Sequence, residues 1–386
     1  MATLKVTSLH ERQQPHVGRK ARRERQEASK RHYGGELRGL APALALSDDP
    51  DAEVGMEACA SDDLRMRSLL PGIPLVESPF FQEIAKASSF DSETLRVAKA
   101  LNEDGFAVFR FPDDKFEERA ARIKARLAPR FDFSCWGAGG WKSGGGMRIG
   151  DAWRFDEDVR ALAANARVLA LLSAIYGRKA WPFQTLNFPV GTQQHYHSDS
   201  VHFSSIPERF MCGLWVALED ISPEAGPLEY YPGSHTWPII YNDKIGVRAT
   251  GLAKSKQSQH LYHNVWQALV EKHGVKPQYF LPKKGEAVVW AANLLHGGSR
   301  QRDPNVTRWS QVTHYYFENC CYITPVQSDI FIGRLRLRSL TNIATGEAVP
   351  NIYIDTPLFK LGHRIALLQA WTRNQFRPLA SRLRNR

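Results

Sequence analysis

The chain has 386 residues, of which 43% are hydrophobic and 24% charged, and this excludes a wholly disordered or fibrous protein. Its 51 basic and 40 acidic residues give a formal net charge of +11. No apolar run is long enough to cross a bilayer, and no stretch of the signal-peptide type stands near the first residue, so we expect no membrane partner.

The five cysteines include the neighbours Cys320 and Cys321 and form no CxxC pattern. An odd number of thiols fits a reducing compartment better than a disulfide framework. We therefore expect a cytoplasmic protein.

Much of the positive charge lies near the two ends of the sequence. Residues 12–38 are rich in Lys and Arg, and residues 373–386 contain five arginines and no acid. Such segments attract nucleic acid or anionic surfaces. We interpret both ends as solvated extensions and keep nucleic-acid binding through them as the less favoured alternative.

Residues 1–65 are polar and are expected to form a basic, disordered extension. Further along, Asp91 is positioned to cap a helix with Leu95, Ala98 and Leu101 on one face and Gly105 at its end. A strand is predicted over 106–111 and a second helix over 116–127. Val168, Leu171, Leu172, Ile175 and Tyr176 have helical spacing, and Gly177 ends that helix.

After Gly177 the pattern changes to short runs rich in β-branched and aromatic residues, separated by Pro and Gly turn signals. Many short strands of this kind favour an antiparallel sandwich or barrel, with the preceding helices packed outside. The predicted strands are 183–190, 210–218, 228–231, 287–290 and 308–317.

The segment 194–199 carries the most informative residues. In a strand, residues two apart project from the same face, so His197 and Asp199 would point to one place. His296, far downstream, offers a third ligand. Two His and one carboxylate are the set that holds non-haem Fe(II) on one face, leaving positions for a co-substrate and O2.

Arg308 follows His296 in a segment that is also predicted as a strand. A planar guanidinium on a rigid strand can bind a carboxylate with two parallel hydrogen bonds. It would suit the far carboxylate of a 2-oxo acid that chelates the iron.

These features resemble the phytanoyl-CoA dioxygenase family of Fe(II)- and 2-oxoglutarate-dependent oxygenases. The resemblance spans about residues 90–320, and its motifs occur in the family's order. They are the segment 102–108, His197-Ser198-Asp199, the segments 214–220 and 226–235, and His296 followed by Arg308.

The resemblance implies a mainly β protein with flanking helices, folded as a double-stranded β-helix of the jelly-roll or cupin type. It implies that His197, Asp199 and His296 bind Fe(II), and that 2-oxoglutarate and O2 are co-substrates. Arg308 then falls on the position that binds 2-oxoglutarate. The remaining co-substrate contacts expected are Trp215, which lines the pocket, Gln184 or Asn187 in place of a family Lys, and Ser299 as a small hydroxyl residue.

The activity implied is hydroxylation of an unactivated C–H bond in a small organic molecule, with release of succinate and CO2. Relatives that halogenate lack the carboxylate that Asp199 supplies. Desaturation and ring chemistry remain open, and the family does not identify the substrate. His195 and His202 are the candidate substrate contacts.

The expected organisation is an oxygenase domain over 66–355 and a basic C-terminal helix or tail over 356–386. The insertion 236–284, rich in His, Tyr and Trp, is expected to cap the pocket mouth. Two alternatives remain open. The barrel is a catalytically silent scaffold that binds nucleic acid through its Arg-rich ends, or the oxygenase acts on nucleic acid or protein.

Overall fold

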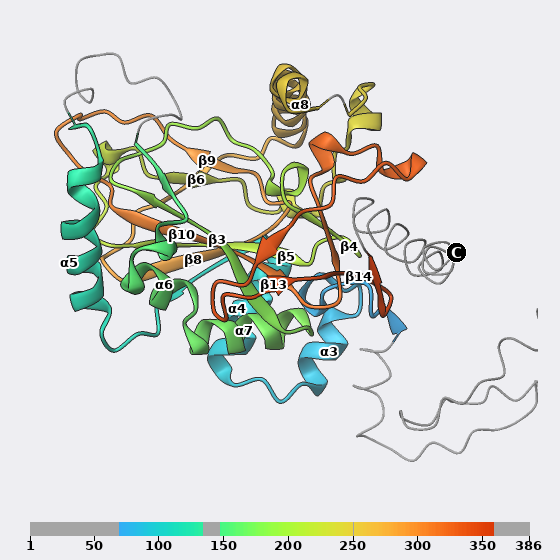
Figure 1. Cartoon of the computed structure of the whole chain (residues 1–386), viewed down its shortest axis with the longest axis horizontal. Helices are drawn as coiled ribbons and strands as arrows, with labels where there is room; N and C mark the ends of the chain where they lie inside the picture. Colours follow the sequence, from blue (N-terminus) through green and yellow to red (C-terminus); the bar gives the residue numbers. More distant parts are fainter. Residues whose placement is uncertain (1–68, 134–146, 250, 359–386) are drawn as a thin grey trace, which may run out of the picture. The chain divides into compact units, whose positions relative to one another are not determined.

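The computed structural model describes residues 69–133, 147–249 and 251–358, with the backbone alone for 251–258 (Figure 1). All of these belong to one compact unit, Ala58–Arg386. The predicted extension 1–65 and most of the predicted tail 356–386 lie outside the described residues.

The larger of the two facing sheets has six strands in the order β1-β8-β5-β10-β3-β2, and every neighbouring pair is antiparallel. All eight residues of β10 are buried, including four polar ones, Ser310, Gln311, Thr313 and His314. The strands are β1 (Phe106–Arg110), β2 (Ile149–Gly150), β3 (Ala180–Phe188), β5 (Met211–Ala217), β8 (Glu286–Ala291) and β10 (Ser310–Phe317).

The smaller sheet has the order β7-β6-β9 and is also antiparallel. It consists of β6 (Leu228–Tyr230), β7 (Gln278–Phe280) and β9 (His296–Gly298). The two sheets enclose a common apolar layer, in which the Trp215 and Phe280 rings meet edge to face at 5.6 Å. This arrangement of two antiparallel sheets with helices outside confirms the predicted double-stranded β-helix class.

Short strand pairs and helices complete the described part of the chain. The pairs are β4 (Ser204–Ile206) with β11 (Cys321–Ile323), β12 (Leu340–Thr341) with β13 (Ala348–Val349), and β14 (Asn351–Tyr353) with β15 (Thr356–Leu358). The α-helices are α3 (Phe81–Ala87), α4 (Ser92–Asp104), α5 (Phe116–Leu127), α6 (Glu157–Ala163), α7 (Ala166–Tyr176) and α8 (Gly251–His273).

The helix-end signals in the sequence act as predicted. The Asp91 side chain accepts from the Thr94 amide at 2.7 Å, and Gly105 ends α4 in the left-handed region at φ 84°. Helix α5 has the predicted bounds. Helices α3, α4 and α7 lie on the side of the large sheet away from the small one, whereas α8 lies beyond the small sheet (Figure 1).

One described segment, Glu157–Tyr176, is long and apolar enough to cross a bilayer by length and composition alone. The structure divides it into α6 and α7, and Asn165 between them caps α7 by accepting from the Val168 amide at 3.1 Å. Helix α7 buries Leu172 and Ile175 in the core against the large sheet. A core helix passes the same test, so this segment is weak evidence for a membrane span.

Helix α6 also supports the outer face of β10. The Gln311 amide donates to the Val159 carbonyl at 3.0 Å, and the Tyr315 hydroxyl donates to the Ala163 carbonyl at 3.0 Å. Because side chains alternate along a strand, the opposite face of β10 presents Val312 and His314 to the space between the sheets.

Helix α5 holds α6 in place through a buried carboxylate. The Asp158 side chain is 2% exposed and accepts 2.8 Å hydrogen bonds from both Arg119 and Arg122. The hydrogen bond from Arg122 is the main reason that the pKa of Asp158 lies below 3.8, and Arg119 adds to it.

We predict that Asp158→Asn lowers the free energy of unfolding by about 2 kcal/mol at pH 7, because the guanidinium groups of Arg119, Arg122 and Arg126 each lose their ion pair with this buried carboxylate. A carboxylate whose pKa is lower in the folded state than in the unfolded state stabilises the folded protein at pH values above the unfolded-state pKa. This stabilisation is lost as the pH falls through the folded-state pKa. The difference between the native protein and the variant should therefore shrink below pH 3.8 in urea titrations. The exposed Glu118, which pairs with Arg122 at 3.6 Å, provides the control Glu118→Gln, expected to change stability by less than about 0.5 kcal/mol.

Candidate metal centre

The structure brings His197, Asp199 and His296 together between the two sheets. Their candidate ligand atoms all lie within 4.8 Å of one another, and all three side chains are buried. His197 and His296 form an antiparallel bridge, with backbone N–O distances of 2.9 and 3.0 Å. That bridge places two segments that are far apart in the sequence side by side.

The expectation that His197 and Asp199 share one strand was wrong in its local detail. His197 forms an isolated bridge, and Asp199 begins the short 3-10 helix η5 (Asp199–Val201). Ser198 between them is held by its hydroxyl, which donates to the Asn293 side chain at 3.0 Å. The turn into η5, rather than strand alternation, aims the carboxylate at the two imidazoles.

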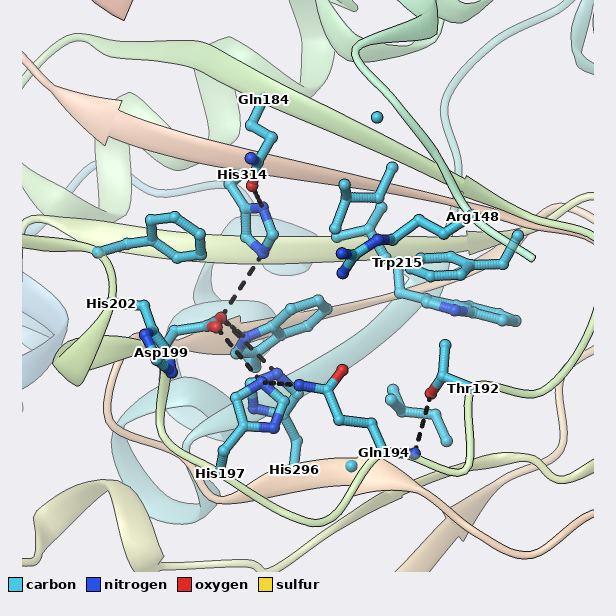
Figure 2. Close-up of a pocket in the computed structure, with 18 of the residues that line it drawn as sticks. Arg148, Gln184, Thr192, Gln194, His197, Asp199, His202, Trp215, His296 and His314 are labelled. Carbon is cyan, nitrogen blue, oxygen red and sulfur yellow. Dashed lines mark hydrogen bonds and ion pairs between the residues drawn. The ribbon is translucent and has the colours of Figure 1, made fainter. Parts of the chain in front are cut away.

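Hydrogen bonds set the orientation of both imidazole rings. The Nδ1 atom of His197 lies 3.1 Å from the His195 carbonyl, and that of His296 lies 3.0 Å from the Leu294 carbonyl. A carbonyl can only accept, so each ring carries its proton on Nδ1 and presents the Nε2 lone pair. Each Nε2 lies 3.7 Å from an oxygen of Asp199 (Figure 2).

The protonation states suit a metal site. Burial, with a smaller contribution from the neighbouring His296, lowers the pKa of His197 to about 3, so this imidazole is neutral near pH 7. Burial on its own would raise the pKa of Asp199, but the imidazoles of His296, His314 and His197 and a hydrogen bond from Trp290 bring it to about 2.

Trp290 on β8 orients the Asp199 carboxylate. Its indole N–H donates to Oδ2 at 2.9 Å, which leaves Oδ1 as the oxygen that faces His197. The indole lies across β5 where Gly213 pairs with it, and a Cβ built on Gly213 would lie 2.1 Å from the ring. Gly213 is therefore the residue that allows Trp290 to reach the carboxylate.

His314 is a third imidazole at the centre, approaching Asp199 from the side opposite to His197 and His296 (Figure 2). Its Nε2 lies 3.7 Å from Asp199 Oδ2, and its Nδ1 lies 3.0 Å from the Gln184 side-chain oxygen. Burial lowers its pKa to about 4. Sequence reasoning missed this residue, although alternation from Arg308 through Val312, along the predicted strand 308–317, places it on the same face.

Arg308 is a buried cation with no carboxylate partner among the described residues. Its side chain is 2% exposed, one nitrogen donates to the Gly226 carbonyl at 2.8 Å, and Nε has no partner. Burial lowers its pKa to about 10. Its guanidinium lies 5.8 Å from the Trp215 ring. Its backbone amide donates to the Pro189 carbonyl at 2.8 Å. Arg308 itself stands just before β10, and not within this strand as predicted.

These groups line one cavity of about 620 Å³, within the range of small-molecule sites. Of the co-substrate and substrate residues predicted from the sequence, Arg308, Trp215, Gln184 and His202 line it. Apolar side chains form much of the remaining wall; they are Leu186, Phe188, Phe203, Leu228 and Val312.

Three of the predicted residues lie elsewhere. Asn187 projects from the other face of β3 and donates to the Gln311 side chain at 3.3 Å, which leaves Gln184 of the two alternatives. The Ser299 hydroxyl donates to the Pro227 carbonyl at 2.9 Å and lines a separate hollow. His195 is exposed and stacks on His263 of α8 at 4.2 Å, so its ring does not line the cavity.

The donor set fits a non-haem iron. Two imidazoles and one carboxylate converge on one place, and cysteine, which structural zinc prefers, does not line the cavity among the described residues. Three protein ligands leave further coordination positions open toward the cavity.

Comparisons with known proteins agree with the order of these residues. The family model described as Phytanoyl-CoA dioxygenase (PhyH) matches residues 101–308, more than half of the chain. No curated protein sequence matches the chain.

Several solved structures are similar. They include the non-haem α-ketoglutarate-dependent epimerase SnoN of nogalamycin biosynthesis, at 18% identity over 70% of this chain and 97% of that one, with a TM-score of 0.46. The carbocyclase SnoK of the same biosynthesis has 15% identity over 69% and 95%, with a TM-score of 0.48. EctD from S. alaskensis with bound Fe has 20% identity over 59% and 77%, with a TM-score of 0.43.

We predict that Trp290→Phe weakens metal binding by about 10- to 100-fold, because Asp199 loses the hydrogen bond that orients it. Gly213→Ala should have a similar effect by displacing the indole. Titration of the metal-free protein with Fe(II) or Co(II) under anaerobic conditions measures both. Trp181→Phe, a buried Trp in the core on the helix side, is the matched control and should bind metal normally. Unchanged metal affinity in Trp290→Phe would contradict the proposed role of Trp290 in orienting Asp199.

Proposed function

Because the chain belongs to the phytanoyl-CoA dioxygenase family of Fe(II)- and 2-oxoglutarate-dependent oxygenases, we propose that it hydroxylates an unactivated C–H bond of a small organic molecule. Succinate and CO2 are the co-products. The observation that carries the proposal is the presence, in one cavity, of the three metal donors and an unpaired buried guanidinium.

His197, Asp199 and His296 would hold Fe(II). When bound, the iron with 2-oxoglutarate and O2 supplies the oxidising chemistry. The chain's own contribution is positional: the Nδ1 hydrogen bonds fix the imidazoles and Trp290 fixes the carboxylate, so the ligands need little rearrangement on binding.

Arg308 would bind the far carboxylate of 2-oxoglutarate. A buried guanidinium is costly unless an anion neutralises it, and among the described residues it donates only to a carbonyl oxygen. Trp215 packs beside it, and its own indole N–H has no hydrogen-bond partner among the described residues. An oxyanion here would satisfy donors that the folded chain leaves unpaired.

The apolar wall formed by Leu186, Phe188 and Val312 excludes water from the space beside the donors. His202 lies in the same wall, with its ring 6.5 Å from that of His197, and we retain it as a substrate contact. Asp199 occupies the position that halogenating relatives leave open, which favours hydroxylation.

Residues 278–280 of the predicted insertion 236–284 form strand β7 of the small sheet, so only the part before β7 is proposed to cap the cavity and to select the substrate. Its helix α8 buries Tyr262 and Trp266 in a cluster with Tyr231 and Val201, next to the metal-binding segment. His263 stacks on His195, two residues before the metal donor His197. Exchange of the part before β7 should therefore change substrate choice.

A catalytically silent scaffold is less favoured, because the donor set and Arg308 are both intact. Nucleic-acid binding by the Arg-rich ends rests on segments outside the described residues, apart from 356–358. Deletion of residues 1–65 followed by retention on DNA at low salt addresses this alternative directly.

An anaerobic Fe(II) titration with and without 2-oxoglutarate tests the proposal. We expect a weak visible charge-transfer band that needs both additives. Asp199→Ala should abolish the band. Arg308→Ala should raise the 2-oxoglutarate concentration needed for half-saturation by about 10- to 100-fold, because a charge-assisted hydrogen-bond pair is lost.

The control Arg334→Ala removes an exposed Arg outside the cavity and should leave both affinities unchanged. Absence of the band in folded, iron-loaded protein would contradict the oxygenase proposal. Succinate release in the presence of candidate substrates is the next measurement.

A further inference from the structure

The cavity contains a second guanidinium that neither the metal nor the co-substrate needs. We propose that the substrate carries a carboxylate, and that Arg148 binds it; this inference rests on the proposed function. Arg148 was not identified from the sequence.

Arg148 immediately precedes β2, the edge strand of the large sheet, where Ile149 pairs with Asn187 and Gly150 with Leu186. The side chain reaches inward, and its guanidinium faces the space above Asp199, beside Trp215 (Figure 2). The described residues offer it neither a carboxylate nor any other hydrogen-bonding partner. A ligand would therefore displace no partner of this guanidinium among the described residues.

The formal charges of the cavity support an anionic substrate. Among the described residues that line it, the charged ones are Arg148, Arg308 and Asp199. Fe(II) carries two positive charges and 2-oxoglutarate two negative ones, so with Asp199 and Arg308 they cancel. The charge of Arg148 remains, and a monoanion would neutralise it.

The depths of the two guanidinium groups assign one to each ligand. Arg308 is 2% exposed, whereas Arg148 is exposed at the edge of the sheet. A co-substrate that chelates the metal must reach the inner site, and the substrate then binds nearer the opening. Arg308 therefore suits the far carboxylate of 2-oxoglutarate, and Arg148 suits the substrate.

The residues that line the cavity near Arg148 indicate the chemistry of the rest of the substrate. Gln184 accepts from His314 through its oxygen, and no described residue accepts from its NH2 group, which can donate to an oxygen of the ligand. Leu186, Phe188 and Phe203 present apolar surface to the cavity. The substrate class that fits is a small carboxylic acid with a hydrocarbon or aromatic body.

The test uses the full chain loaded with Mn(II) and 2-oxoglutarate, which keeps the cavity occupied without turnover. The probes are monocarboxylic acids with alkyl or aromatic bodies, each paired with its primary amide, and binding is followed by tryptophan fluorescence. We expect the tightest acid to bind at least tenfold better than its amide. Arg148→Gln should remove that preference, and Arg148→Lys should restore part of it.

Arg154→Gln is the matched control, since Arg154 is a nearby exposed Arg that stacks on Trp153 and does not line the cavity. Equal binding of acids and amides, or no binding of any acid, to the native protein would overturn the inference. A loss of 2-oxoglutarate affinity in Arg148→Gln comparable to that in Arg308→Ala would also overturn it, by assigning Arg148 to the co-substrate. Failure of 2-oxoglutarate to bind the native, metal-loaded protein would instead contradict the proposed function itself.

Discussion

The backbone bridge between His197 and His296 is the contact on which the rest of the site depends. Its two hydrogen bonds join the segment before η5 to β9 of the small sheet, and they bring two imidazoles to a ring separation of 4.6 Å. Neither histidine could be positioned by its own segment alone. The antiparallel pairing of the segment before η5 with β9 therefore creates the candidate metal centre, and local structure only refines it.

The refinement comes from groups that do not themselves face the metal position. Main-chain carbonyls hold the Nδ1 atoms, and the Trp290 indole holds one oxygen of Asp199. Trp290 can do so because its cross-strand neighbour, Gly213, has no side chain. A ligand geometry specified by strand pairing thus depends on a small residue on a neighbouring strand, in a position that no metal-binding motif would include.

The charged groups occupy different parts of the cavity. Asp199 and the imidazoles occupy one part, Arg308 is buried without an anion, and Arg148 lies at the exposed edge of the large sheet. Each buried charge is costly until a ligand of opposite sign arrives, so the folded chain already favours a metal cation and a carboxylate. The Gln184–His314 pair and the apolar wall then limit what else can enter.

Local sequence determined a large part of this protein. Local propensity predicted the helix ends at Asp91 and Gly105, the helix from Phe116 and the order of the short strands. The family pattern predicted four site residues, which are His197, Asp199, His296 and Arg308. The tertiary structure alone decided which faces meet. It placed Asn187 and Ser299 outside the cavity, brought His314 and Arg148 into it, and aimed Trp290 at Asp199. Those outcomes depend on strand register and on contacts between distant segments, which a single sequence does not specify.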